Sequence, residues 1–111
     1  MMDNYTLETD FPTDESFFTL TDDNHNRGFT MLLPNGIVVS IRWGTMNYSD
    51  NRTMRPTMND SATSAECAAY SFKTKDFVKV PEFGMDGDDV LPRMSTSEVA
   101  RFIYNASLMS V

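Results

Sequence analysis

The sequence predicts an α+β fold, an antiparallel sheet of four or five strands with one C-terminal helix packed on one face. Two patterns predict this fold class. An Asn35-Gly36 pair, the typical signal of a tight hairpin, comes directly before residues 37–43, which carry one wholly apolar face. A Ser-Thr-Ser-Glu capping box then opens residues 95–108, where apolar side chains recur at helical spacing.

The first two strands are expected at residues 17–21 and 29–33, which are runs of aromatic, aliphatic and β-branched residues. The polar residues 22–28 between them predict a turn. This segment spaces its acidic and amide side chains as an EF-hand calcium loop does. Arg27 stands where such a loop requires glycine, so a hairpin turn is favoured over calcium binding.

The third strand, at residues 37–43, has two different faces. One face carries large apolar side chains, which we expect to be buried: Ile37, Val39, Ile41 and Trp43. The other face includes Ser40 and Arg42, and we expect it to be at least partly wet.

A long irregular segment follows this strand at residues 45–64 and is rich in Met, Asn and Arg. Loops of about twenty residues are uncommon in small domains and are often either functional or disordered. Two further strands are expected at residues 65–72 and 76–80. Residues 81–94 are expected to form a polar connection.

The helix is expected over residues 96–108, with Ser95 as its N-cap and Glu98 closing the capping box. One apolar stripe runs along it: Val99, Phe102, Ile103 and Ala106. If this stripe packs on the sheet, Phe102 and Ile103 should be largely buried against the third strand.

A chain of 111 residues is long enough for one domain. We expect an acidic, partly mobile N-terminal arm at residues 1–15 and a single α+β domain at residues 16–111. The sequence has no apolar run of membrane-spanning length, no signal peptide at its start and one cysteine, Cys67. These features predict a cytoplasmic protein that does not bind membranes.

The net charge of −7 bears on nucleic-acid binding. Affinity for a nucleic-acid backbone comes mainly from basic residues that neutralise phosphates, so direct binding to nucleic acid is not expected. Residues 26–80 have an excess of basic residues between two acidic ends. A local basic site in this middle segment and a solvated surface of mixed charge both stay open.

Residues suited to enzymatic chemistry are scarce. Cys67 and His25 are the only residues of their types, so a zinc site or a Cys–His catalytic pair is poorly supplied. We expect no catalytic residue, no metal site and no cofactor. The alternative is a small metal-dependent phosphohydrolase that uses one acidic cluster: Asp86, Asp88 and Asp89.

Phosphate recognition has better-suited residues. Arginine side chains match phosphate oxygens, and aromatic rings stack on bases. The residues that could form such a nucleotide-binding site lie at the end of the third strand and in the loop after it: Arg42, Trp43, Tyr48, Asn51, Arg52 and Arg55. No glycine-rich nucleotide motif accompanies them. A core position for Trp43 and a surface position for the arginines is the other interpretation.

Several short motifs are spread over residues 29–104: Asn35-Gly36 before a strand, Gly44 with Asn47-Tyr48, Ser64-Ala65-Glu66, Asp88-Asp89-Val90 and a short capped helix. In these motifs the chain resembles small uncharacterised proteins encoded by tailed bacteriophages. The resemblance implies a biological setting, because small early phage proteins often bind and disable host defence or host machinery. It assigns no functional residue.

The function expected from these observations is that of a small non-enzymatic binding protein, encoded by a phage, that inhibits the host by occupancy. It would either block a host protein or sequester a small nucleotide signal. For a protein partner, the methionines of residues 45–64 would offer an adaptable contact surface. Whether the chain forms a homo-oligomer stays open.

Overall fold

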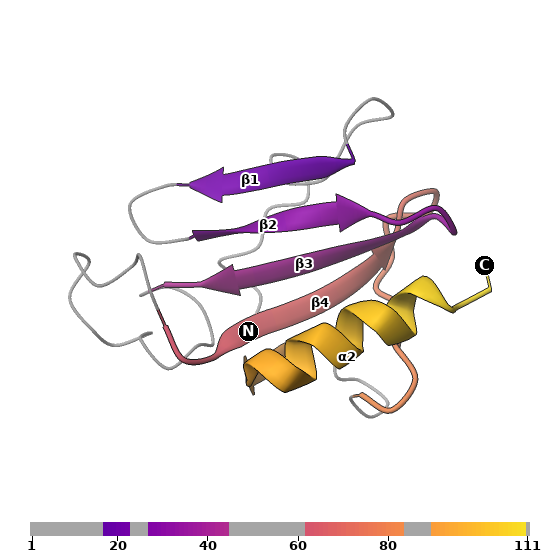
Figure 1. Cartoon of the computed structure of the whole chain (residues 1–111). Helices are drawn as coiled ribbons and strands as arrows, with labels where there is room; N and C mark the ends of the chain where they lie inside the picture. The colour runs from indigo at the N-terminus through magenta and orange to yellow at the C-terminus, as the bar shows by residue number, and fades with distance from the viewer. Residues whose placement is uncertain (1–16, 23–26, 45–61, 84–89, 111) are drawn as a thin grey trace.

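The structure, a computed structural model, describes residues 17–22, 27–44, 62–83 and 90–110. Within them, five strands form one antiparallel sheet in which each strand pairs with the next one along the chain (Figure 1). The strands are β1 (Phe18–Asp22), β2 (Arg27–Leu32), β3 (Ile37–Trp43), β4 (Ala65–Ser71) and β5 (Leu91–Met94). The helix α2 (Thr96–Ser107) packs on one face of the sheet against β3, β4 and β5. The predicted fold class is confirmed. The described residues contain no helix with the length and apolar character needed to cross a membrane.

The hairpin between β2 and β3 turns at Pro34 and Asn35. Gly36 N donates to Leu33 O at 2.9 Å, and Leu33 N donates to Ile37 O at 2.8 Å. Gly36 follows the turn with a φ of 88°, a conformation that costs glycine little. The predicted hairpin is confirmed, although Asn35 does not adopt the positive φ expected of an Asn-Gly turn.

Asn35 instead ties this hairpin to the end of α2. Its Nδ2 donates to the carbonyl oxygens of Ala106 and Met109, at 2.8 and 2.9 Å. Its Oδ1 accepts from Ile37 N at 3.1 Å. Because the last carbonyls of a helix have no partner within the helix, this one side chain fixes the C-terminal end of α2 against the sheet.

The capping box at the N-terminus of α2 is confirmed. Ser95 N donates to Glu98 Oε1 at 2.8 Å, and Glu98 N donates to Ser95 Oγ at 3.2 Å. The backbone bond, followed by the side-chain bond, holds the pKa of Glu98 below its ordinary value of 4.5. The ionised carboxylate therefore stabilises the first turn of the helix.

Replacing Glu98 with glutamine is expected to reduce the acid sensitivity of the fold. A carboxylate whose pKa is lowered by folding adds stability above its unfolded pKa, and the contribution is lost as the pH falls through the folded value. The variant should therefore melt below the wild type near neutral pH, and the difference should shrink as the pH falls through the folded pKa of Glu98. Thermal unfolding followed by circular dichroism measures the difference at each pH. A difference in melting temperature between variant and wild type that stays the same in acid would contradict this role of Glu98.

The main core lies between the sheet and α2. Its buried members come from β3, β4, β5, α2 and the segments after β2 and β4: Leu33, Ile37, Val39, Ile41, Ala65, Cys67, Ala69, Val80, Phe83, Met94, Phe102 and Ala106. Phe83 meets Phe102 edge to face, with the ring centroids 5.6 Å apart. The buried residues of α2, Phe102 and Ala106, thus hold the helix on the sheet together with the segment that follows β4.

The burial predicted for this core is confirmed at three positions, Val39, Ile41 and Phe102. Trp43 and Ile103 are of intermediate burial, which is less complete than at these three positions. Both residues border an open space between α2 and the end of β3, and this space leaves part of each side chain accessible.

The opposite face of the sheet is also buried. Val38, Ser40 and Arg42 are at most 1 % exposed, so the prediction of a partly wet face is wrong. A second apolar cluster accounts for burial at one end of this face: Val38, Ala68 and Tyr70, with Leu32, Phe72, Phe77 and Val90 packed against it. The polar residues Ser40 and Arg42, which alternate with apolar residues along β3, therefore do not mark a solvent-exposed face.

The prediction of a strand at residues 76–80 is wrong. Phe77 makes one isolated bridge to Tyr70, and the chain then leaves the sheet to reach the helix-side core. The fifth strand is β5, which falls in the segment predicted to be a polar connection. β5 is short, contains Pro92 and has Arg93 at a φ of 52°, so its sequence lacks the usual strand signals.

Candidate functional site

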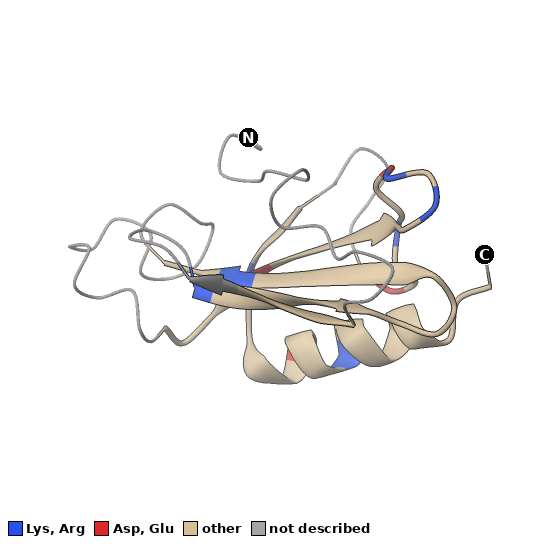
Figure 2. Cartoon of the chain, turned by 90° about the horizontal axis from the view of Figure 1, so that it is seen from above, with Lys and Arg blue, Asp and Glu red and all other residues tan. Residues whose placement is uncertain are grey.

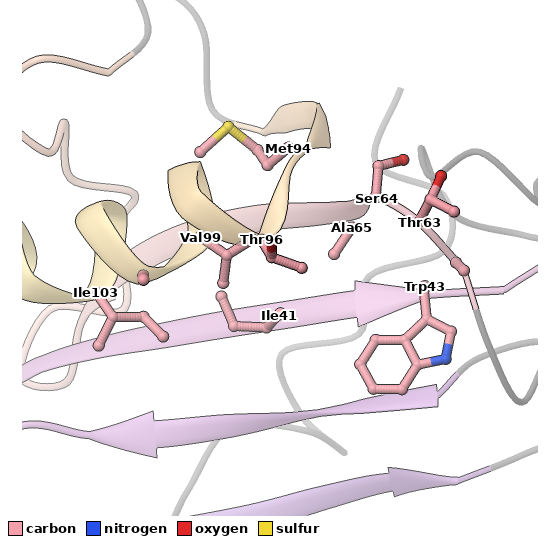
Figure 3. Close-up of a pocket in the computed structure, with 11 residues that line it drawn as sticks. Ile41, Trp43, Thr63, Ser64, Ala65, Met94, Thr96, Val99 and Ile103 are labelled. Carbon is pink, nitrogen blue, oxygen red and sulfur yellow. The ribbon is translucent and has the colours of Figure 1, made fainter.

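An open groove lies between the N-terminal half of α2 and the end of β3 (Figure 3). We call it the helix groove. It is lined by residues of α2, β3, the start of β4 and the end of β5: Ile41, Trp43, Ala62, Thr63, Ser64, Ala65, Met94, Thr96, Val99, Ala100 and Ile103. Its volume is about 360 Å³, which is within the range of about 300–1,000 Å³ that ligand pockets occupy. None of these lining residues carries a charge.

Local sequence explains why the helix groove is open. The helix begins directly after β5, which fixes its first turns beside the start of β4. Small side chains at Ala65 and Ala100 leave space that larger residues would fill. Across this space, Val99 and Ile103 of α2 lie opposite Ile41 of β3 in Figure 3. The result is an apolar groove between two rigid elements.

Trp43 stands at one end of the helix groove. It is the last residue of β3 and the only tryptophan of the chain. Because it is partly exposed, its indole ring offers accessible apolar surface beside the groove. Large aromatic residues that are rigidly held often contribute most of the energy of an interface.

The apolar surface continues from the helix groove onto β2 and β1. Phe29 is the register partner of both Ile41 and Leu20, so all three residues lie on the helix side of the sheet. The main contacts of α2 are with β3, β4 and β5. Phe18 and Leu20 of β1 are accordingly each 74 % exposed. Exposed apolar clusters of this kind typically mark interaction surfaces.

A buried pair of opposite charges lies on the other face of the sheet. Arg42 and Glu66 are register partners on β3 and β4, and they are 1 % and 0 % exposed. Figure 2 shows a basic and an acidic segment side by side in the sheet, with α2 below. Directly opposed residues have their Cβ atoms about 4.5–5.5 Å apart, so the two side chains lie close to each other within the sheet. Nearby, Ser40 Oγ is buried and has no hydrogen-bond partner in the described part of the chain.

The structure separates the two predicted binding residues that it describes. Arg42 and Trp43 are consecutive residues of β3, so their side chains project from opposite faces of the sheet. Trp43 borders the helix groove, whereas Arg42 is buried beside Glu66. The other four predicted binding residues fall outside the described residues: Tyr48, Asn51, Arg52 and Arg55.

Cys67 is poorly placed for nucleophilic chemistry. It is fully buried in the helix-side core, and burial, followed by the charges of Glu66 and Glu98, raises the pKa of its thiol to about 12. The thiol is therefore protonated at physiological pH. His25 and the acidic cluster at 86–89 lie outside the described residues. Within the residues that are described, no group of three His, Cys, Asp or Glu side chains could hold a metal ion.

The helix groove could not be predicted from the sequence patterns used above, because its walls come from distant parts of the chain. One signal pointed to it. Val99 and Ile103 lie to one side of the buried row formed by Phe102 and Ala106, so the apolar stripe of α2 is wider than one row. Ala100 extends this side of the helix.

Comparisons with known proteins identify no relative. No family model matches the chain, and neither a curated protein nor a solved structure is significantly similar to it. The geometry of the chain itself is therefore the basis for inferring a function.

Proposed function

We propose that this chain is a small non-enzymatic binding protein that acts by occupancy, and that its helix groove holds apolar side chains of a partner protein. The observation that carries the proposal is the lining of the groove, which is apolar and uncharged and includes the partly exposed Trp43. Apolar side chains inserted there would be removed from contact with water. This burial stabilises a complex by about 25 cal/mol per Å² of buried apolar area.

A protein partner fits this surface better than a nucleotide does. A nucleotide needs cationic groups to meet its phosphates, and none of the described residues that line the helix groove is charged. Arg42 lies on the opposite face, buried across from Glu66 of the neighbouring strand.

The resemblance to phage proteins supplies a setting for this proposal. A phage-encoded protein of this kind would inhibit host defence or host machinery by covering a surface that a host protein needs. Its effect would require a stable complex and no chemical step. The metal-dependent phosphohydrolase is the alternative, and its candidate ligands at residues 86–89 lie outside the described residues.

Replacing Ala100 with glutamate tests the helix groove as the binding site. Ala100 is an exposed helix residue that lines the groove, and glutamate is a good helix former, so the fold should be retained. The probes are peptides with apolar residues at helical spacing, selected from a displayed library against the wild type. Their binding is followed by the fluorescence of Trp43. We expect the variant to bind them at least about tenfold more weakly, because a carboxylate would be covered by apolar groups.

The matched control is Ser97→Glu, at an exposed position of α2 that does not line the helix groove. It should bind the selected peptides as the wild type does. Equal affinity of the wild type and Ala100→Glu would contradict the proposal. Selection of acidic peptides without apolar residues would contradict it as well.

A further inference from the structure

The two edges of the sheet are protected to different degrees. An exposed edge strand presents unpaired backbone groups, and proteins guard such edges with short strands, proline, basic side chains or breaks in pairing. β5 has all of these features: it is the shortest strand, it contains Pro92 and Arg93, and its pairing with β4 is interrupted by a register shift. This edge is closed to further strands.

β1 has fewer of these features. Its five residues pair with β2 in one uninterrupted register, and its sequence, Phe-Thr-Leu-Thr-Asp, holds no proline, lysine or arginine. Phe18 and Leu20 are each 74 % exposed, and the adjoining Phe17 is 61 % exposed. Within the described residues no strand pairs with the outer edge of β1. An open and apolar edge of this kind is suited to receive another strand.

We propose that β1 pairs with β1 of a second copy of this chain, in antiparallel register about a two-fold axis through Leu20. This inference is independent of the partner protein assigned to the helix groove. It concerns the β1 edge of the sheet, away from the helix groove. The contact is also of a different kind, because it consists of hydrogen bonds between backbone groups of two strands.

The hydrogen bonds of β1 set the register of this pairing. Leu32 N donates to Phe17 O at 2.9 Å, and this bond flanks the Phe18–Met31 pair. That pair, and the Leu20–Phe29 pair two residues on, are therefore of the non-hydrogen-bonded type. It follows that the N–H and C=O groups of Phe18 and Leu20 point away from β2, toward an incoming strand.

In this register each residue of β1 has a defined partner in the second copy. Leu20 would lie opposite Leu20 of the second copy and exchange two backbone hydrogen bonds with it. Thr19 would lie opposite Thr21 of the second copy. Because the two-fold axis is perpendicular to the sheet, both α2 helices would lie on the same face. The two Leu20 residues would meet at the axis, and Phe18 would lie opposite Asp22 of the second copy.

The area available is that of a small interface. A fully buried aromatic side chain removes about 150–250 Å² from water, so two copies of Phe17 and Phe18, at 61 % and 74 % exposure, offer roughly 540 Å², to which Leu20 adds. The paired backbone edges add to this area. The total approaches the value of about 1,000 Å² that specific interfaces exceed.

Charge substitutions at Leu20 test the proposal. Leu20→Lys and Leu20→Glu each place like charges opposite one another across the two-fold axis, which disfavours pairing. Each variant alone should have a dimer dissociation constant at least about tenfold higher than that of the wild type in sedimentation velocity experiments. An equimolar mixture of the two variants should recover the dimer, because opposite charges then face each other.

The matched control is Tyr104→Lys, which changes an exposed aromatic residue of similar accessibility, 63 %, on α2. It should dimerise as the wild type does, and all three variants should keep the melting temperature of the wild-type monomer. A wild-type protein that stays monomeric at every concentration would overturn the proposal. So would unchanged dimerisation of both Leu20 variants, or a mixture that stays monomeric when each variant alone has lost the dimer.

Discussion

Replacing Phe102 with alanine is expected to lower the free energy of unfolding by about 3–5 kcal/mol, as is usual for the truncation of a buried phenylalanine. Phe102 is 1 % exposed and is the largest buried side chain that α2 contributes to the core. Its ring packs edge to face on Phe83. The substitution would therefore leave a cavity at the point where the helix, the sheet and the segment after β4 meet. Urea denaturation followed by circular dichroism measures the loss.

The control for this prediction is Tyr104→Ala, at an aromatic residue of the same helix that is 63 % exposed. Its effect should stay within about 0.5 kcal/mol, because it removes little buried surface. A loss below about 1 kcal/mol for Phe102→Ala would show that α2 does not pack on the sheet as described.

Breaking the buried charge pair is expected to have a similarly large effect. Replacing Glu66 with leucine would remove the carboxylate opposite the buried Arg42, and removing one member of a buried pair of opposite charges typically costs about 3–5 kcal/mol. Replacing Arg42 with methionine would in turn remove the guanidinium opposite the buried Glu66. The double variant removes both charges and should lose much less than the sum of the two single losses.

A double-mutant cycle of these three variants in urea measures the coupling between Arg42 and Glu66. Strictly additive losses would show that the two side chains do not compensate each other. A single variant as stable as the wild type would show that its charge is not buried in solution.

The fold could be predicted where local patterns and long-range packing agree. The alternation of residues 37–43 predicts β3, and the box formed by Ser95 and Glu98 predicts the start of α2. β5 could not be predicted, because Pro92 and Arg93 oppose strand formation and pairing with β4 alone places the segment in the sheet. Residues 76–80 have strand-like composition, yet the edge of β4 beside them accepts one bridge at Phe77.

The candidate site was predicted less well, for a related reason. The alternation of β3 correctly places Arg42 and Trp43 on different faces, but it does not reveal what covers each face. Arg42 was expected to meet water or phosphate, and Glu66 on the neighbouring strand lies opposite it instead. Ala100 and Ala65 matter because they are small, and small residues give no pattern in a sequence.

The position of a bound apolar peptide tests the central claim most directly. The measurement is a comparison of NMR spectra of methyl groups and of the Trp43 indole, with and without a peptide selected against the wild type. The helix groove predicts that the largest changes fall on Trp43, Ile41, Val99 and Ile103, which line it. Changes centred on Val38, Ala68 and Tyr70, on the opposite face of the sheet, would contradict the claim.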